Sequence, residues 1–336
     1  MKVIEIQEKF GIDSLKIAER EEPTPSHGNI VVKVKATSLN YRDLLTVQGL
    51  YNPKQKLPLI PLSDGVGEVV AIGEGVSRVK VGDRVAGIFA QKWVSGNPTK
   101  AKMVTTLGGP LDGMLAEYAL LHEDGVVHVP EHLTDEEAAT LPCAAVTAWS
   151  ALVTYGQLKA GETVLVQGTG GVSIFALQFA KLMGAKVIVT SSSDEKLQKA
   201  KELGADELIN YHSTPSWEKR VREITGGEGV DHIVEVGGAG TFDRSLKSIK
   251  FAGQISVIGI LSGLATEVNL IPILMQNVRI QGIIVGSRET FEDMNRAVSV
   301  NKLKPVIDKV FSFGETKEAF NYMASAGHFG KIVIKL

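Results

Sequence analysis

Residues 162 to 190 constrain the fold more than any other stretch of the sequence. Thr163 to Val166 is a short β-branched and aliphatic run between Gly161 and the glycines that follow, which is typical of a buried parallel strand. The turn Gly168-Thr169-Gly170-Gly171-Val172-Ser173 then opens into an apolar helical stretch that ends at Gly184. Lys186 to Thr190 predicts the next strand. Strand, turn, helix and strand in this order make a βαβ unit.

The start of the predicted helix favours a dinucleotide pyrophosphate, because its amides are free and its dipole is positive there. We predict that Gly168, Gly170, Gly171 and Val172 bind this group. Ser173 replaces the third glycine of the G-x-G-x-x-G pattern, but it is small enough to let the helix lie close to the strand. A tight turn in another α/β sheet is the alternative, and the order of elements on both sides favours dinucleotide binding.

Length and composition indicate an ordinary two-domain protein. A chain of 336 residues is too long for one core, and 44% hydrophobic with 22% charged residues is typical of soluble globular proteins. A net charge of −2 gives no reason to expect nucleic acid or an anionic membrane as a partner. The first residues do not resemble a signal peptide, and the most apolar stretch, Ala138 to Val153, is interrupted by Pro142. We therefore expect a cytoplasmic protein that acts on a small-molecule substrate.

The first part of the chain, to about residue 125, is expected to be β-rich. The predicted strands are Lys2–Ile6, Ile30–Ala36, Gly67–Ile72, Arg84–Phe89 and Ala116–Leu121, with one helix near Arg42–Val47. Residues 91 to 113 are rich in glycine and proline and have no periodicity, so we predict a long loop. A solvated loop is favoured there over a lid or a contact surface.

Helices and apolar strands alternate from Thr134 onward, which predicts a parallel, doubly wound sheet. The predicted helices begin with one capped by Thr134 and continue at Cys143–Tyr155, Asp194–Leu203, Trp217–Ile224, Phe242–Ile249 and Glu289–Val298. The predicted strands are Glu207–Asn210, Asp231–Val236, Gln254–Ile258, Asn277–Val285 and Lys331–Lys335.

Several motifs together resemble the medium-chain dehydrogenase/reductase superfamily, specifically its zinc-free, quinone-oxidoreductase-like branch. The matching segments are Ala36–Asp43, Gln48–Tyr51, Asp64–Gly75, Val81–Val85, Gly168–Ser173, Leu203–Asp206, Ile209–Tyr211 and Gly330–Ile334. The resemblance covers nearly the whole chain. It implies an α/β protein with a Rossmann doubly wound parallel sheet at residues 126–286 and a β-rich GroES-like catalytic domain built from residues 1–125 and 287–336.

Neither zinc site of the zinc-dependent relatives is expected here. Their three catalytic ligands correspond to Asn40, Ser63 and Cys143, and one thiol with an amide and a hydroxyl does not make a catalytic zinc site. Their structural zinc is held by four cysteines in a loop that corresponds to residues 91 to 113, which contain no cysteine. Cys143 is the only cysteine, so an intramolecular disulfide is excluded, and we interpret it as a small buried hydrophobe.

The end of the second predicted strand bears on the choice of nicotinamide cofactor. An NAD-binding unit normally has an acidic residue there, whereas this chain has Ser191 and Ser192, which suit a 2′-phosphate better. The resemblance implies that Lys196 and Tyr211 also contact this phosphate. Asp194 opposes that interpretation, and we expect it to be the N-cap of the following helix instead. NADPH is therefore the expected cofactor.

Catalysis by a nicotinamide enzyme requires the protein to position the substrate and stabilise the oxyanion that hydride arrival creates. The resemblance places Asn40, Arg42, Tyr51 and Thr147 near that reaction, with Thr147 assigned to the cofactor. We expect Tyr51 to donate to the substrate oxygen or, as an equal alternative, to pack on the nearby helix. Asn40 is expected to orient the substrate or a water, with helix capping as the alternative.

The remaining predicted residues surround these groups. The alternative role for Arg42 is an ion pair with Asp43. Asp43 and Asp64 are expected to flank the position that holds the catalytic metal in zinc-dependent relatives. The resemblance implies that four residues after the later strands approach the nicotinamide, namely Gly259, Leu261, Gly286 and Ser287. It also implies that Lys331 lies near the pyrophosphate, with a surface lysine as the alternative.

These features predict a zinc-independent NADPH-dependent oxidoreductase that transfers hydride to a quinone, an enone or another reactive carbonyl. An NADPH-binding protein without metabolic turnover, such as a crystallin-like or regulatory protein, is the alternative. A homodimer is also expected, because the strand Asn277–Val285 is apolar and carries only one charge, Arg279. An outer strand of this kind is an aggregation hazard if it stays unpaired, and relatives pair it across a two-fold axis. Cover by residues 91–113 or by the C-terminal segment is the alternative.

Overall fold

The computed structural model describes all 336 residues, Met1–Leu336, and divides them into two compact units. The first unit contains Met1–Val146 and Gly286–Leu336, and the second contains Thr147–Val285. We expected the first boundary after residue 125, and it lies after Val146 instead. The reason is that β7 (Val126–His128) pairs with β5 (Arg84–Gly87) inside the sheet of the first unit.

The first unit is a β-sheet domain with a few short helices. Its other strands are β1 (Lys2–Ile6), β2 (Leu15–Glu19), β3 (Asn29–Leu39), β4 (Asp64–Ile72), β6 (Tyr118–His122), β14 (Ile307–Ser312) and β15 (Lys331–Lys335). Its helices are α1 (Tyr41–Val47), α2 (Lys100–Met103), α3 (Asp135–Ala138), α10 (Arg288–Val300) and α11 (Thr316–Ala324). Short 3-10 or π turns are η1 (Ile12–Ser14), η2 (Glu123–Gly125), η3 (Leu141–Ala145) and η5 (Phe313–Glu315).

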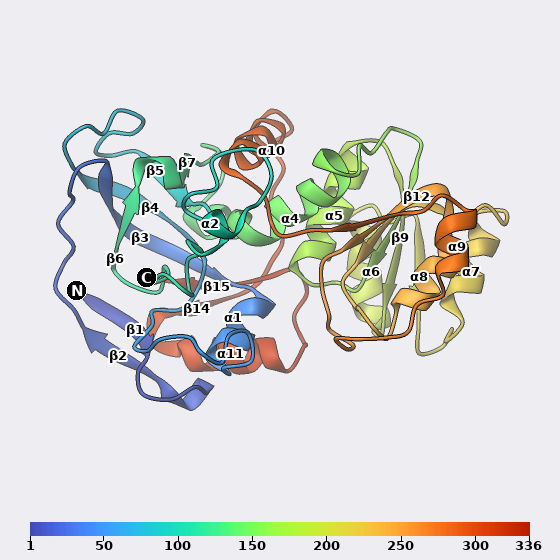
Figure 1. Ribbon diagram of the computed structural model, residues 1–336, viewed down its shortest axis with the longest axis horizontal. Coiled ribbons are helices and arrows are strands. Elements are labelled where there is room, and N and C mark those ends of the chain that lie inside the picture. Colours follow the sequence, from blue (N-terminus) through green and yellow to red (C-terminus); the bar gives the residue numbers. More distant parts are fainter. The chain divides into compact units, whose positions relative to one another are not determined.

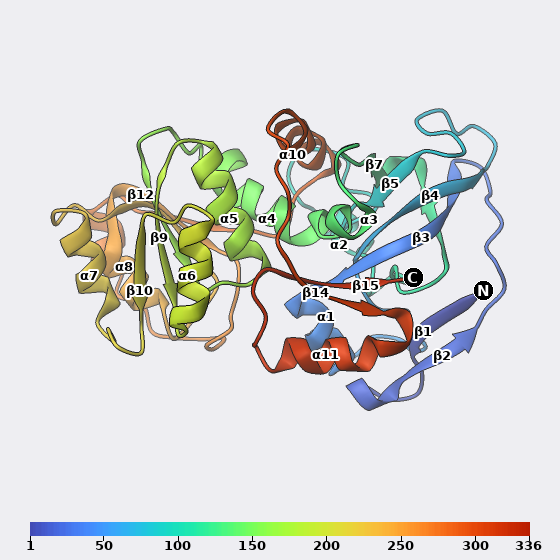
Figure 2. The ribbon, with the colours of Figure 1, turned by 180° about the vertical axis from the view of Figure 1, so that it is seen from behind.

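The main sheet of this unit brings the two ends of the chain together. Its strand order is β14-β15-β3-β4-β5-β7, and β6 pairs with the first half of β3. The C-terminal strand β15 runs antiparallel to β3, with Ile332 opposite Leu39. Figure 2 shows this strand beside the early strands of the domain. One buried core lies between β1, β3, β15 and α11, and includes Leu39, Phe320 and Ile332.

The second unit is a six-stranded sheet flanked by helices (Figure 1). The strands are β8 (Thr163–Gln167), β9 (Lys186–Ser191), β10 (Glu207–Asn210), β11 (Val230–Glu235), β12 (Ile249–Val257) and β13 (Arg279–Gly282). The helices are α4 (Val146–Trp149), the π turn η4 (Ser150–Thr154), α5 (Gly171–Leu182), α6 (Asp194–Glu202), α7 (Trp217–Ile224), α8 (Phe242–Ser248) and α9 (Leu270–Met275).

The strand order of the second unit is that of a doubly wound sheet. All neighbouring strands are parallel in the order β10-β9-β8-β11-β12-β13. The chain moves outward from β8 to β10, returns to β11, and moves outward on the other side. The reversal between β8 and β11 is the place where α/β sheets bind ligands, beyond the carboxyl ends of the strands. The predicted α/β fold class, a doubly wound parallel sheet with a β-rich domain, is therefore confirmed.

Some elements differ from the expectation. The solvated loop predicted at residues 91 to 113 contains α2, and Trp93, Thr106 and Leu107 are buried, so packing holds much of it in place. The helix predicted at Cys143–Tyr155 is interrupted by π turns on both sides of α4. Strands β2, β7 and β14 and helices α9 and α11 were not predicted. No helix has the length and apolar character needed to cross a membrane.

Candidate functional site

The glycine turn after β8 is built to leave space at the start of α5. Gly168 has φ +70°, a value that favours glycine, and its amide donates to Thr190 O at 2.8 Å. Gly170 is the N-cap of α5 and has an ordinary φ of −77°. A Cβ added at Gly170 would meet no atom within 4 Å, so neither backbone conformation nor packing in the chain requires glycine there. Open space beside free helix amides fits a phosphate ligand.

The serine in place of the third glycine has its own function in the turn. Ser173 is 2% exposed, and its hydroxyl donates to Gln167 O at 2.7 Å, which ties the first turn of α5 to the end of β8. The helix therefore stays close to the strand, as predicted. Gly168, Gly170, Gly171 and Val172 lie together at the carboxyl end of β8, the end of the sheet at which α/β proteins bind ligands.

The residues predicted to contact a 2′-phosphate lie at the carboxyl ends of β9 and β10. Ser191 is buried and Ser192 is exposed, and Tyr211 N donates to Ser191 O at 3.0 Å. Lys196 lies in the first turn of α6, and the Tyr211 ring is 38% exposed. The structure thus brings these ends together on one edge of the sheet.

The predicted N-cap of α6 is wrong by one residue. Ser193 is the N-cap, and its hydroxyl accepts from Lys196 N at 3.3 Å. Asp194 is the first helical residue, and its Oδ1 accepts from Asn210 Nδ2 at 2.7 Å. Asn210 therefore binds the Asp194 carboxylate, which was the feature that argued against NADPH as the cofactor.

A buried carboxylate at the carboxyl end of β11 was not predicted from the sequence. Glu235 is fully buried and accepts from Gln167 Nε2 at 2.7 Å, from the amides of Gly237 and Gly238, and from the hydroxyls of Thr241 and Ser245. These bonds join β8 to β11 where the strand order reverses. The available sequence signal was a polar residue, Gln167 or Glu235, at the end of each of two apolar strands.

The residues predicted to lie near the nicotinamide differ in their burial and in their contacts within the protein. Gly259 follows β12, and a Cβ added there would lie 2.4 Å from Val236 O, so this glycine is required by close packing inside the protein. Leu261 is 55% exposed, and Thr147 is buried in α4. Ser287 is the N-cap of α10 and accepts from Thr290 N at 3.2 Å, while Gly286 is the first residue of the returning segment. The structure therefore gives Ser287 a helix-capping role, which does not test its predicted approach to the nicotinamide.

A buried polar group forms where β3, β4 and β15 meet in the first unit. Lys331 is 2% exposed, and its ammonium donates to Asn40 Oδ1 at 2.6 Å and to Leu39 O at 2.7 Å. Its nitrogen also lies 3.4 Å from Asp64 Oδ2, which accepts from Ser38 Oγ at 2.9 Å. An ammonium has three N–H donors, and these three acceptors use all of them. The predicted contact of Lys331 with the pyrophosphate is therefore not supported, and a surface lysine is excluded.

Arg42 and Asp43 form a second buried ion pair in the same region. Arg42 Nη1 lies 3.1 Å from Asp43 Oδ1, and its guanidinium also donates to the carbonyls of Leu107 and Gly109. Burial raises the pKa of Asp43, and the Arg42 charge acts in the opposite direction. Since its donors bind loop carbonyls and Asp43, the structure favours the ion-pair role of Arg42 over a catalytic one.

Tyr51 and Asn40 keep both of their proposed roles. Tyr51 is 53% exposed, and its ring lies 5.0 Å from the Arg42 guanidinium, so it packs on α1 and leaves much of its surface accessible. Asn40 is the N-cap residue of α1, and Asp43 Oδ2 accepts from its backbone amide at 2.9 Å. The Asn40 side chain meanwhile accepts the hydrogen bond from Lys331.

The residues at the expected metal position do not suit zinc. Asn40 Oδ1 is bound to Lys331, and Ser63 Oγ donates to Asp64 Oδ1 at 3.3 Å. Cys143 is partly buried, and desolvation, reinforced by the Asp64 charge, raises the pKa of its thiol. No group of three His, Cys, Asp or Glu side chains in the chain is arranged to hold a metal ion.

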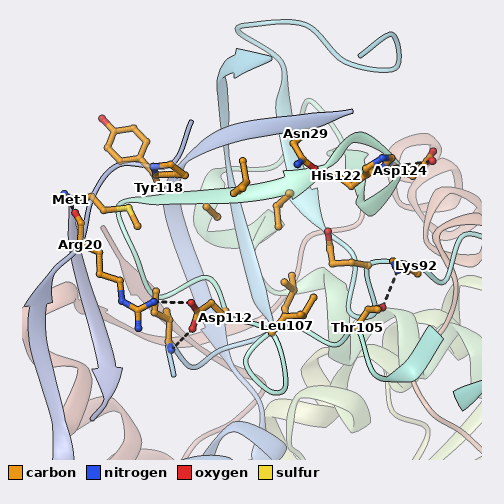
Figure 3. Close-up of a pocket in the computed structure, with 18 of the residues that line it drawn as sticks. Met1, Arg20, Asn29, Lys92, Thr105, Leu107, Asp112, Tyr118, His122 and Asp124 are labelled. Atoms are coloured by element: carbon orange, nitrogen blue, oxygen red, sulfur yellow. Dashed lines mark hydrogen bonds and ion pairs between the residues drawn. The ribbon is translucent and has the colours of Figure 1, made fainter. Parts of the chain in front are cut away.

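A hollow of about 780 Å³ lies elsewhere in the first unit, beside β6 and the segment 105–113 (Figure 3). Its charged side chains are largely paired within the protein: Arg20 lies 2.8 Å from Asp112, and Asp124 lies 2.6 Å from Arg288. None of the residues predicted for catalysis or cofactor binding lines it. We therefore treat the buried Lys331 group of the first unit and the glycine turn of the second unit as two separate candidate sites.

Comparison with known proteins identifies the family of the chain. Residues 26–131 match the alcohol dehydrogenase GroES-like domain, and residues 171–299 match the zinc-binding dehydrogenase domain. A zinc-type alcohol dehydrogenase-like protein of Schizosaccharomyces pombe is 46% identical, with 97% of this chain and 96% of that protein covered.

Two solved structures are similar over the full length of both chains. An NAD-dependent alcohol dehydrogenase shares 33% identity with a TM-score of 0.91. A mycobacterial protein complexed with NADPH shares 27% identity with a TM-score of 0.84. The fold, the glycine turn and these matches agree, and the chain belongs to the medium-chain dehydrogenase/reductase superfamily as an oxidoreductase with a pyridine-nucleotide-binding fold.

Proposed function

We propose that the chain is a zinc-independent, NADPH-dependent oxidoreductase that reduces a reactive carbonyl compound such as a quinone, an enone or an aldehyde. The observation that carries this proposal is the buried Lys331 ammonium, held between Asn40 and Asp64. This cation contacts Asn40, one of the positions that correspond to zinc ligands in relatives. The ammonium occupies the Asn40 oxygen and so competes with a metal ion for it, and its charge, which Asp64 partly neutralises, favours negative charge on a nearby substrate oxygen.

The cofactor preference is supported by the residues at the carboxyl end of β9. Ser191 and Ser192 stand where NAD-binding units present a carboxylate, and Asp194 is bonded to Asn210. Lys196 supplies a positive charge in the first turn of α6. When bound, the reduced nicotinamide supplies a hydride to the substrate carbon and is oxidised, and the substrate oxygen takes up a proton from solvent.

The proposal is tested by turnover assays together with metal analysis. Purified protein is mixed with NADPH or NADH and a panel of quinones, enones and aldehydes, and cofactor oxidation is followed by absorbance. We expect faster turnover with NADPH and far less than one zinc per chain by elemental analysis. A stoichiometric zinc whose removal abolishes activity would contradict zinc independence. Quenching of NADPH fluorescence by the protein, without oxidation by any acceptor, would instead support the binding-protein alternative.

A further inference from the structure

Among the polar side chains around the buried Lys331 ammonium, the Asn40 amide has the least complete set of hydrogen bonds. Asn40 is 8% exposed, and its Nδ2 is a buried donor without a hydrogen-bond partner. Leaving such a donor unpaired is costly, and folded proteins rarely tolerate it without a reason. Every ammonium proton of Lys331, by contrast, has an acceptor.

Lys331 also determines which end of the amide is unpaired. An ammonium only donates, so the amide atom 2.6 Å from Lys331 Nζ has to be the oxygen. The amide nitrogen of Asn40 is therefore the atom that has no hydrogen-bond partner. Asp64 Oδ2 accepts hydrogen bonds from both Lys331 and Ser38. Asp64 therefore helps to fix the Lys331 ammonium, and Ser38 helps to fix Asp64.

We propose that the Asn40 NH₂ is the hydrogen-bond donor for the substrate's carbonyl oxygen, and that Lys331 is the positioning residue that directs it. This inference rests on the proposed function, and it specifies what the substrate presents: an acceptor oxygen. The ammonium next to Asn40 polarises the amide and stabilises negative charge that develops on that oxygen. Because the donor is enclosed, a hydrogen bond formed there is shielded from water and is stronger than one at the surface.

The test compares four variants in steady-state kinetics with the carbonyl that the wild type reduces best. Asn40→Asp removes the donor and keeps an oxygen for Lys331, and Lys331→Met removes the charge that orients the amide. Lys335→Met, on the same strand but exposed and paired with Glu136, is the matched control. The Asn40→Asp/Lys331→Met double variant tests whether the two residues act as a unit.

We expect Asn40→Asp and Lys331→Met each to lower kcat by roughly 10²-fold, as loss of one oxyanion donor does elsewhere. The Kd for NADPH, measured by fluorescence, should stay within about twofold of wild type, and the double variant should lose little more than either single variant. Lys335→Met should behave as wild type. A higher NADPH Kd in Lys331→Met with unchanged kcat would overturn the proposal and return Lys331 to the cofactor phosphate.

Infrared spectroscopy provides a readout that does not depend on folded variants. A carbonyl ligand bound to wild type with the oxidised cofactor should show a lowered C=O stretching frequency relative to apolar solvent. An unshifted band would overturn the assignment of Asn40. If wild type turns over carbonyls and Asn40→Asp does so equally well, the inference fails and the proposed function stands. If wild type binds NADPH and reduces no carbonyl, both fail.

Discussion

Asn210 Nδ2 donates a 2.7 Å hydrogen bond to Asp194 Oδ1, which fixes the first carboxylate of α6 against the end of β10. Both residues lie next to the serines at the carboxyl end of β9, since Asn210 is opposite Ser191 in the parallel sheet. The contact gives Asp194 a partner within the protein. It therefore weakens the argument that this acidic residue binds an adenosine ribose.

Substitution of Lys196 tests the cofactor preference directly. Lys196→Ala should weaken NADPH binding by about 1.5–3 kcal/mol, the value of a hydrogen bond to a charged group, and leave NADH binding nearly unchanged. Fluorescence titration with each cofactor measures the difference. Lys199→Ala, which removes an exposed lysine paired with Glu195 on the same helix, is the control. Equal losses for both cofactors would show that Lys196 does not contact the 2′-phosphate.

We propose a homodimer formed through the edge strand β13. This strand pairs only with β12, and Ile280 and Ile284 remain 42% and 51% exposed. The neighbouring helix α9 exposes Leu270, Leu274 and Met275 by 68%, 79% and 67%, and exposed apolar side chains that gather in this way often mark a protein–protein contact.

Ile280→Asp should convert the dimer to a monomer, because it places a charge in the apolar contact. Light scattering at micromolar concentration should give twice the chain mass of 36.0 kDa for wild type and a mass near 36.0 kDa for the variant. Val300→Asp, at an exposed apolar position of α10 in the other unit, should leave the mass unchanged. A wild-type mass near that of one chain would exclude the dimer.

Glu235 should stabilise the second unit through the hydrogen bonds it accepts. Glu235→Gln replaces one carboxylate oxygen with an NH₂ group. This new donor faces other hydrogen-bond donors, such as Gln167 Nε2 or the Thr241 hydroxyl. We expect a loss of about 1–3 kcal/mol in the free energy of unfolding, measured by urea denaturation. Glu131→Gln, at an exposed position, is the control. Unchanged stability would mean that the network tolerates an amide.

His232 should make stability depend on pH. Its ring is 5% exposed, and burial lowers its pKa below the ordinary value, although the Glu162 carboxylate at 3.0 Å acts in the opposite direction. Below the ordinary pKa of about 6.5, the unfolded chain binds a proton that the folded chain resists. The free energy of unfolding should therefore fall as the pH drops through this range.

His232→Gln should reduce this acid sensitivity, because glutamine does not titrate. Thermal unfolding followed by circular dichroism between about pH 7.5 and pH 5.5 gives the slope of Tm against pH. His212→Gln, which changes an exposed ring, should keep the wild-type slope. A His232→Gln slope equal to that of wild type would assign the acid sensitivity to other groups.

The order and type of the central elements followed from the sequence because they depend on local patterns. The glycine turn at Gly168 to Ser173, the apolar strands around it and the helix that follows are all encoded within about thirty neighbouring residues, and periodicity is sufficient to recognise them. Strand β13 was also predicted from its apolar residues, although it is shorter than expected. Elements with weaker patterns, such as β7 and α11, were missed, and the first domain boundary was displaced with β7.

The composition of the candidate site was decided by tertiary structure. Asn40 and Lys331 are separated by 291 residues, and they meet because β15 pairs antiparallel with β3 and places Ile332 opposite Leu39. The sequence identified both residues as candidates, but assigned Lys331 to the pyrophosphate, since side-chain direction cannot be read from spacing across such a distance. Likewise, Glu235 and Gln167 become one network only when parallel pairing brings β8 beside β11. Local sequence determined which elements form, and long-range strand pairing decided which side chains share a site.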